Sequence, residues 1–267
     1  MSEVSPSTPA IRASSLRFGY GKTLLFDGFD LDIPQGVTTG IVGPNGSGKS
    51  TLLKLFCGLL VPQAGEICLA ATPLSGLSDR ERAKFIAFMP QDNSAVHMSV
   101  ADLVMSGRFC HQGFLHLPSS EDELICQEAM ELAGLCGLSQ RSVGSLSGGQ
   151  RQRAYFAMVL AQRAGTLLLD EPTSALDIGA SHQVMRLVCD IQAQRGGTTV
   201  VVLHDLDLAL RYCDHVIVMQ DGRVAAQGTA NQLADAGVLG QVFGVHIHST
   251  QTPFGRCWSF FPNPQGD

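Results

Sequence analysis

Apolar and polar residues alternate along positions 10–33, on either side of a Gly19-Tyr20-Gly21 turn. A period of two is typical of short, half-buried antiparallel strands. A β-branched strand over 36–42 comes next, and a glycine-rich loop leads from it into a helical pattern over 50–60 that ends before Pro62. The pattern therefore predicts an antiparallel β-subdomain followed by a strand, loop and helix unit.

The pattern changes at about residue 93. Residues 99–104 and 121–132 both show capping residues followed by apolar positions spaced near 3.6, which predicts inserted helices. Farther along, helices alternate with strands over 150–162, 166–170, 179–194, 198–203 and 206–212. This alternation indicates a mainly parallel sheet. The run 216–219 leads into an Asp221-Gly222 turn, as in a β-hairpin.

These patterns divide the chain into five parts: a disordered tail (1–9), an antiparallel β-subdomain with the first part of the core (10–92), a helical subdomain (93–145), the rest of the core (146–230) and a C-terminal extension (231–267). A length of 267 residues with 45% hydrophobic residues suits one large domain or a domain with a helical appendage.

Composition narrows the class of partner. The formal net charge of -6 leaves no basic field of the kind that binds a nucleic-acid backbone, so we expect no nucleic-acid partner. The first nine residues have neither a cationic nor an apolar region and read as a polar tail instead of a secretory signal. No stretch approaches the ~18 consecutive apolar residues that span a bilayer. The eight cysteines, none in a C-x-x-C pair, are expected to be free thiols in a reducing compartment.

One segment matches the phosphate-binding P-loop pattern G-x-x-x-x-G-K-[ST], and it lies between a β-branched strand and a helix. Its glycines let successive backbone N–H groups and the helix N-terminus point at the phosphates of a nucleotide. Lys49 supplies a cation to the β- and γ-phosphates, and the Ser50 hydroxyl is placed to bind Mg²⁺. The expected nucleotide-binding residues here are Gly43, Pro44, Asn45, Gly46, Ser47, Gly48, Lys49, Ser50 and Thr51. The motif establishes nucleotide binding only, since kinases, GTPases and motor ATPases share it.

A second helix N-terminus is built to hold a phosphate. Ser147, Gly148, Gly149 and Gln150 precede or open the helix over 150–162, and they offer a hydroxyl and exposed N–H groups. This segment comes about 100 residues after a loop that already cradles the nucleotide. A head-to-tail pair of chains would bring the two half-sites together and enclose two nucleotides.

Two carboxylates, Asp170 and Glu171, end the apolar strand over 166–170, where an open α/β sheet delivers catalytic groups. We expect Asp170 to orient Mg²⁺ through water. Glu171 is placed to position or deprotonate the attacking water. His204 likewise follows the strand over 198–203.

Leu146-Ser147-Gly148-Gly149-Gln150 is identical to the signature motif of the ATP-binding cassette (ABC) family, and neighbouring motifs match in order and spacing over about residues 10–230. This resemblance implies a P-loop NTPase fold of the α/β class that hydrolyses ATP with Mg²⁺. It also implies that Tyr20 stacks on adenine, that Gln91 touches Mg²⁺ and relays movement to membrane subunits, that residues 174–177 cross between two cassettes, and that His204 is the switch histidine that contacts the γ-phosphate.

Three further stretches, 104–108, 176–183 and 203–212, resemble importers of ferric siderophores, haem and cobalamin. The resemblance implies a peripheral subunit on the cytoplasmic face of the cell membrane. Its expected partners are a second cassette, integral membrane permease subunits and, indirectly, an extracytoplasmic substrate-binding protein. A soluble ABC ATPase without a transport role and an exporter subunit stay open as alternatives.

Overall fold

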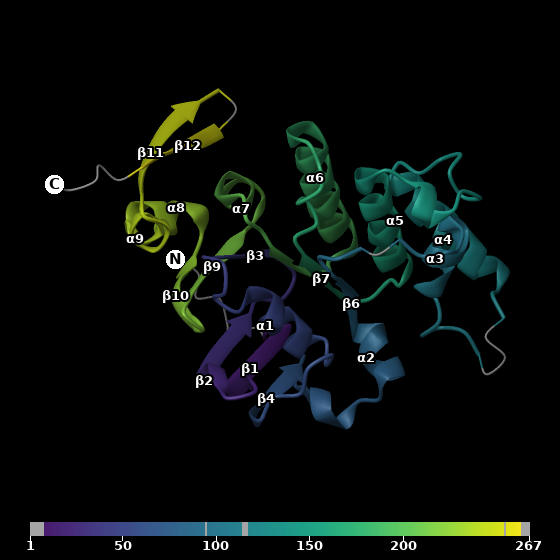
Figure 1. Cartoon of the computed structure of the whole chain (residues 1–267), viewed down its shortest axis with the longest axis horizontal. Helices are drawn as coiled ribbons and strands as arrows, with labels where there is room; N and C mark the ends of the chain where they lie inside the picture. Colours follow the sequence, from purple (N-terminus) through teal and green to yellow (C-terminus); the bar gives the residue numbers. More distant parts are fainter. Residues whose placement is uncertain (1–7, 94, 114–116, 254, 263–267) are drawn as a thin grey trace.

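The computed structural model describes residues 8–93, 95–113, 117–253 and 255–262. All but the last two residues of the predicted tail 1–9 lie outside these ranges. A six-stranded sheet forms the centre, in the order β10-β9-β3-β8-β7-β6 (Figure 1). Its strands are β3 (Thr38–Val42), β6 (Ile86–Met89), β7 (Thr166–Asp170), β8 (Thr198–Val202), β9 (His215–Gln220) and β10 (Arg223–Gly228).

Only the β9–β10 pair in this sheet is antiparallel, so the predicted mainly parallel sheet is confirmed. Strands β3 and β8 are buried at every position, as expected of β-branched residues in a sheet covered on both faces. Along β8, Val200 and Val202 face one hydrophobic cluster while Val201 faces the other. The alternation places an apolar layer on each side of the sheet.

A four-stranded antiparallel sheet, β2-β1-β4-β5, packs below the central sheet in Figure 1. It comprises β1 (Ile11–Tyr20), β2 (Thr23–Ile33), β4 (Ala64–Leu69) and β5 (Thr72–Pro73). Helix α1 (Lys49–Phe56) shares a hydrophobic cluster with both sheets. It ends four residues before the predicted end, because Gly58 takes a left-handed backbone with φ of +74°. Helix α2 (Asp79–Phe85) then leads into β6.

Helices α3 (Val100–Ser106), α4 (Ser120–Leu132) and α5 (Gly148–Ala161) pack together at one end of the molecule (Figure 1). The buried Arg108 joins them, since its guanidinium donates to Asp122 of α4 at 2.8 Å and to the carbonyl of Ala161 in α5 at 2.9 Å. A division of the chain at residue 145 therefore separates α5 from the helices that it contacts.

Helices α6 (Ile178–Arg195) and α7 (Leu206–Tyr212) cover the face of the central sheet opposite α1. The C-terminal extension forms α8 (Ala230–Asp235), α9 (Val238–Phe243) and a hairpin of β11 (Val245–Thr252) and β12 (Gly255–Pro262) (Figure 1). The hydrophobic pattern did not predict these four elements.

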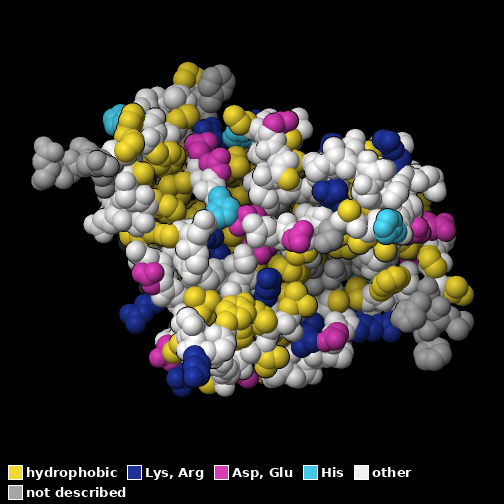
Figure 2. Space-filling view, viewed as in Figure 1, with side chains coloured by type: hydrophobic (Ala, Val, Ile, Leu, Met, Phe, Trp, Pro, Cys, Tyr) yellow, Lys and Arg dark blue, Asp and Glu magenta, His cyan; other side chains and the backbone are white. Residues whose placement is uncertain are grey.

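The surface agrees with the charge balance of the sequence. On the face in Figure 2, lysine and arginine side chains are scattered and form no continuous positive field. Within the described ranges, no helix combines the length and apolar character needed to cross a bilayer. All eight cysteines are free thiols, of which Cys110, Cys126 and Cys213 are buried and Cys136 is exposed.

Candidate nucleotide site

The P-loop joins β3 to α1 and needs glycine at two positions. A Cβ atom on Gly43 would lie 2.1 Å from the carbonyl oxygen of Met219, so no side chain fits there. Gly48 caps α1 with φ of +101° and provides no side-chain acceptor for the first helical N–H groups. The space around Gly46 is open. The N-terminus of α1 is thus left free to receive an anionic ligand.

Lys49 lies at the floor of the loop, where only 5% of the residue is exposed. Its ammonium donates to the carbonyls of Gly43 (2.8 Å) and Pro44 (3.0 Å). Burial lowers the pKa of Lys49, and the nearby carboxylates of Glu171 and Asp170 oppose this shift. The cation is therefore held ready in a poorly solvated position, where its attraction to a phosphate is strong.

Asp170 ends β7 directly beneath the P-loop. The hydroxyl of Ser50 donates to its Oδ1 at 2.9 Å. Burial raises the pKa of Asp170, and the hydrogen bond from Ser50 opposes the shift. The pair places a hydroxyl and a carboxylate, both oxygen ligands, side by side.

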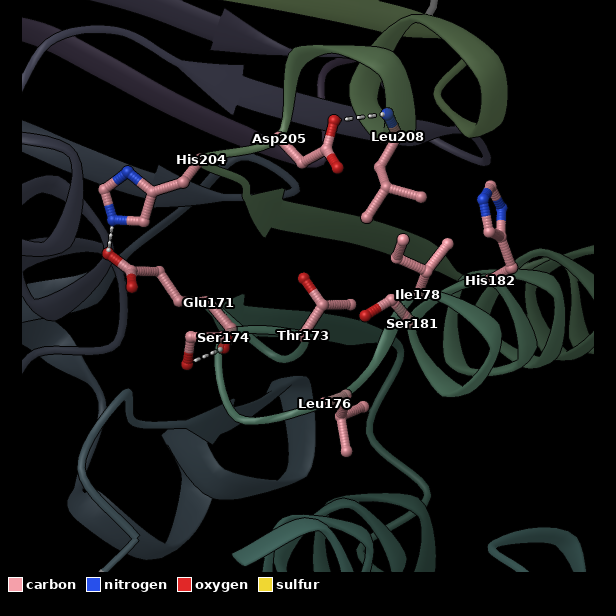
Figure 3. A pocket seen from close by; sticks show the side chains of 10 residues that line it. All are labelled: Glu171, Thr173, Ser174, Leu176, Ile178, Ser181, His182, His204, Asp205 and Leu208. Atoms are coloured by element: carbon pink, nitrogen blue, oxygen red, sulfur yellow. Dashed lines mark hydrogen bonds and ion pairs between the residues drawn. The ribbon is translucent and has the colours of Figure 1, made fainter.

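Glu171 is the point on which two loops converge. Nε2 of Gln91, in the loop after β6, donates to its Oε2 at 2.6 Å. Nε2 of His204, in the loop after β8, lies 2.5 Å from its Oε1. Figure 3 shows the imidazole of His204 directed at this carboxylate. The structure thus brings together the predicted residues Gln91, Glu171 and His204, from three different strand ends.

An open pocket surrounds the P-loop. Its lining includes Tyr20, Leu25, Thr51, Glu171 and His204 together with the loop itself. Tyr20 ends β1, is 54% exposed, and approaches Thr51 with its hydroxyl at 3.3 Å. Its ring packs edge-on against Phe18 with centroids 5.1 Å apart. A partly exposed aromatic ring at the rim is suited to stack on a base.

The signature segment lies elsewhere. None of its residues is among the described residues that line the P-loop pocket. Ser147 and Gln150 form a capping box in which each side chain bonds the other's backbone N–H at 3.2 Å. Ser147 and Gly148 are exposed. The second half-site therefore exposes Ser147 and Gly148 at a place that does not line the P-loop pocket of its own chain.

A second pocket lies between the loop after β7 and the start of α7 (Figure 3). Leu176, Ile178 and His182 line one side of it, and His204 and Asp205 line the other. Ile178 is 81% exposed although it is a large apolar residue. This pocket continues the surface that carries Glu171 and His204.

Comparison with known proteins decides the family. The model of the ABC transporter family matches residues 26–174, which is more than half of the chain. The chain belongs to the ABC transporter family. This cassette is 38% identical over 258 residues to YusV of Bacillus subtilis (strain 168), named as a probable siderophore transport system ATP-binding protein, with 96% of this chain and 94% of YusV covered.

Two solved structures resemble the cassette. One, described as an ABC transporter assigned to the metal-chelate type in an inward-facing conformation, has a TM-score of 0.81 at 28% identity and covers 96% of this chain and 98% of that one. The other is the dimeric cassette of a bacterial ABC transporter, MJ0796, with a TM-score of 0.74 at 28% identity over 82% of this chain and 98% of that one. The predicted fold is confirmed, and the cassette is an ATPase subunit whose hydrolysis is coupled to transport.

One buried contact of the site was not predicted. Gln152 of α5 is 3% exposed, and its Nε2 donates to the backbone carbonyl of Glu171 at 3.2 Å. The sequence holds a signal for it, since Gln152 is a polar residue that lies four residues before the buried Phe156 and eight before the buried Leu160 on the same helix face. A polar residue on the apolar face of a helix requires a buried partner.

Proposed function

We propose that this cassette powers the uptake of a metal chelate through separate membrane permease subunits, with a ferric siderophore as the first candidate and haem or cobalamin as the others. The similarity to YusV and to the metal-chelate type transporter supports this class of cargo. The convergence of Gln91 and His204 on Glu171 beside the P-loop carries the assignment of hydrolysis. The similarity to YusV favours an importer subunit over a soluble ABC ATPase and over an exporter subunit.

ATP fits the pocket around the P-loop. The backbone of Gly43–Ser50 would surround the β- and γ-phosphates, with Lys49 as the cation, and Thr51 would lie beside them. Tyr20 would stack on adenine at the rim. The open space at Gly46 and the uncapped start of α1 are the observations that favour a bound polyphosphate.

The residues at the base of the pocket fit Mg²⁺, because Ser50 and Asp170 already place two oxygen atoms together. Gln91 would complete the set with its side-chain carbonyl, since its amide nitrogen faces Glu171. The ion, when bound, would neutralise charge on the phosphates. Ser50 and Asp170 would hold it in position, and the raised pKa of Asp170 would fall again beside a cation.

Glu171 would accept the proton of the attacking water. Its carboxylate is held by Gln91 on one oxygen and faces His204 on the other, so two loops orient it. His204 would contact the γ-phosphate when the imidazole turns from the carboxylate. The protein's contribution is thus mainly positioning.

A second copy would complete each site. Ser147 and Gly148 are exposed, and with the half-buried Gly149 they would offer the Ser147 hydroxyl and the glycine N–H groups to a phosphate held by another chain, since none of them lines the P-loop pocket of this one. Gln150 would keep this helix start capped. The exposed Ile178 extends the same surface and would be buried between copies. The dimeric form of the similar MJ0796 cassette supports this arrangement.

Permease subunits would dock on the groove at the end of α1. The groove is lined by Cys57, Leu59, Ala83, Ile86 and Phe88, and Leu59 is 64% exposed. Because β6 runs from this groove to the loop of Gln91, a segment that binds there would contact the strand that carries a site residue. The cassette would then lie on the cytoplasmic face of the cell membrane, with an extracytoplasmic binding protein delivering the cargo.

Uptake in cells that lack this chain tests the proposal. We expect accumulation of radiolabelled ferric siderophore to fail, and to return with the wild-type chain but not with Glu171→Gln. Haem and cobalamin uptake measured in parallel identify the cargo. Normal accumulation of all three chelates would contradict the proposal, and increased accumulation of one of them would indicate an exporter.

A further inference from the structure

Glu171 has an unusual backbone. Its φ of +54° lies in the left-handed region, which a residue with a side chain adopts only where its surroundings impose it. Its N–H donates to the carbonyl of Val202 in β8 at 3.2 Å. This geometry turns the carboxylate out of the line of β7 toward Gln91 and His204.

The carbonyl of Glu171 is held by several donors. The hydroxyl of Ser174 donates to it at 3.1 Å and the backbone N–H of Ser174 at 3.3 Å. Both come from the turn that follows Glu171 itself. Gln152, at 3.2 Å, is the donor from a different element, α5.

The side chain of Gln152 has no other hydrogen bond among the described residues. It is 3% exposed, and its Oε1 is buried without a partner. A buried amide that is half satisfied destabilises a fold, so packing alone would favour an apolar residue at this position. The bond to Glu171 is the interaction that this glutamine provides.

Helix α5 touches the same loop at a second point. A Cβ atom built on Gly149 would lie 3.0 Å from Cδ2 of Leu176, so the start of α5 packs closely on the turn after Glu171. Gly149 belongs to the signature segment. The helix start and the backbone of the catalytic carboxylate are thus connected through Leu176 and Gln152.

We propose that Gln152 is a positioning residue that ties the orientation of the Glu171 carboxylate to the signature helix of the same chain. The proposal rests on the function proposed above, in which the signature segment binds the phosphates of a nucleotide held by a second copy. Engagement of one nucleotide by α5 would then orient the carboxylate that serves the other nucleotide. Gln152 makes the two sites of the dimer interdependent.

The test compares Gln152→Met with Gln192→Met in the full-length chain. Methionine keeps the length of the side chain and removes the donor. Gln192 is the matched control, because its amide also donates to a backbone carbonyl, that of Gly36. Gln192 lies in the last turn of α6 and does not contact Glu171 through this bond. We expect Gln152→Met to lower kcat for ATP hydrolysis about ten-fold, the loss of roughly one buried hydrogen bond, with an unchanged KM. Its Hill coefficient for ATP should approach 1, and Gln192→Met should retain the parent values.

Gln152→Leu is the second variant, for use if Gln152→Met does not fold. Leucine is an apolar side chain suited to a position that is 3% exposed, and it has no donor for the Glu171 carbonyl, so the same loss of kcat is expected. Parent kcat and Hill coefficient in the folded variant, or equal losses in Gln192→Met, would overturn the proposal. The two proposals can be distinguished. If Glu171→Gln hydrolyses ATP at the parent rate, Glu171 is not the base. If Glu171→Gln is inactive and Gln152→Met is unaffected, only the role of Gln152 is contradicted.

Discussion

The two anion-binding helix starts of this cassette differ in how they are held. At the P-loop, Lys49 is buried and Ser50 bonds Asp170, so the polar side chains are anchored in the core. At the signature segment, the side chains of Ser147 and Gln150 accept from each other's backbone N–H, and Ser147 and Gly148 are exposed. The first is a cradle that the chain completes alone. The second has no such support in the core, which agrees with the proposal that a second copy completes it.

The largest effect is expected from a substitution of Glu171, the carboxylate beside the P-loop. Glu171→Gln removes the proton acceptor but keeps the shape of the side chain, and its amide oxygen can still accept from Gln91. We expect ATP turnover to fall by about 10³-fold, the middle of the range for a general base, while ATP binding is retained. Steady-state phosphate release and equilibrium binding of a fluorescent ATP analogue measure both. Turnover at the parent rate would show that Glu171 is not the base.

The helices that pack around the signature segment can be destabilised at the buried Arg108–Asp122 ion pair, which joins α4 and α5. Asp122→Asn leaves Arg108 buried without its anionic partner and should destabilise the fold by roughly 3–5 kcal/mol in urea unfolding. Asp32→Asn, which breaks the exposed pair with Arg12, is the control and should cost about 1 kcal/mol or less. ATP affinity at the P-loop should persist in Asp122→Asn below the unfolding transition.

The same variant has a defined pH dependence. A backbone hydrogen bond from Ser119 and the Arg108 guanidinium lower the pKa of Asp122 to about 2. Because the folded value lies below the unfolded value of about 3.9, the carboxylate stabilises the fold above about pH 4 and loses this effect as the pH falls through 2. The difference in stability between wild type and Asp122→Asn should therefore shrink between pH 4 and pH 2. A difference that stays constant over this range would contradict the assignment.

Lys49→Ala removes the cation of the cradle. We expect ATP affinity to fall about 10- to 100-fold, as for the loss of a charge-assisted hydrogen bond. Lys84→Ala, on α2, removes the same charge outside the pocket and should leave affinity unchanged. Isothermal titration of both variants with ATP is the measurement. Unchanged ATP affinity in Lys49→Ala would contradict the assignment of the P-loop as the phosphate-binding site.

The smallest effect is expected at the rim. Tyr20→Ala should weaken ATP binding about 2- to 10-fold, the value of one aromatic contact, while Tyr20→Phe keeps the ring and should bind nearly as the parent. If Tyr20→Phe lost as much affinity as Tyr20→Ala, the hydroxyl contact to Thr51 would matter more than stacking.

Much of the fold was predictable because its long elements have clear periods. The buried β-branched β8 and the capped helices α4 and α5 carry their signals in a few consecutive residues. Short elements such as β6, with four residues, carry too little pattern. The hairpin β11–β12 is stabilised by packing on α7 and α9, and no local pattern reveals that packing.

The site was predictable residue by residue but not in its connections. Asp170, Glu171 and His204 follow apolar strands, which is a local signal. The left-handed backbone of Glu171 and its bond from Gln152 depend on contacts between elements distant in sequence, so the spacing of motifs gave no indication of them. The roles of these residues in ATP hydrolysis remain predictions for the variants above.

The central claim is that the P-loop of one chain and the signature segment of another share one ATP. Sedimentation with ATP of the Glu171→Gln chain and of the Glu171→Gln, Ser147→Arg double variant tests it most directly. We predict a dimer for Glu171→Gln, and a monomer that still binds ATP when Ser147→Arg fills the exposed helix start. Ser145→Arg, at an exposed position two residues earlier, is the control and should leave the dimer intact. A Ser147→Arg chain that still dimerises with ATP would contradict the shared site.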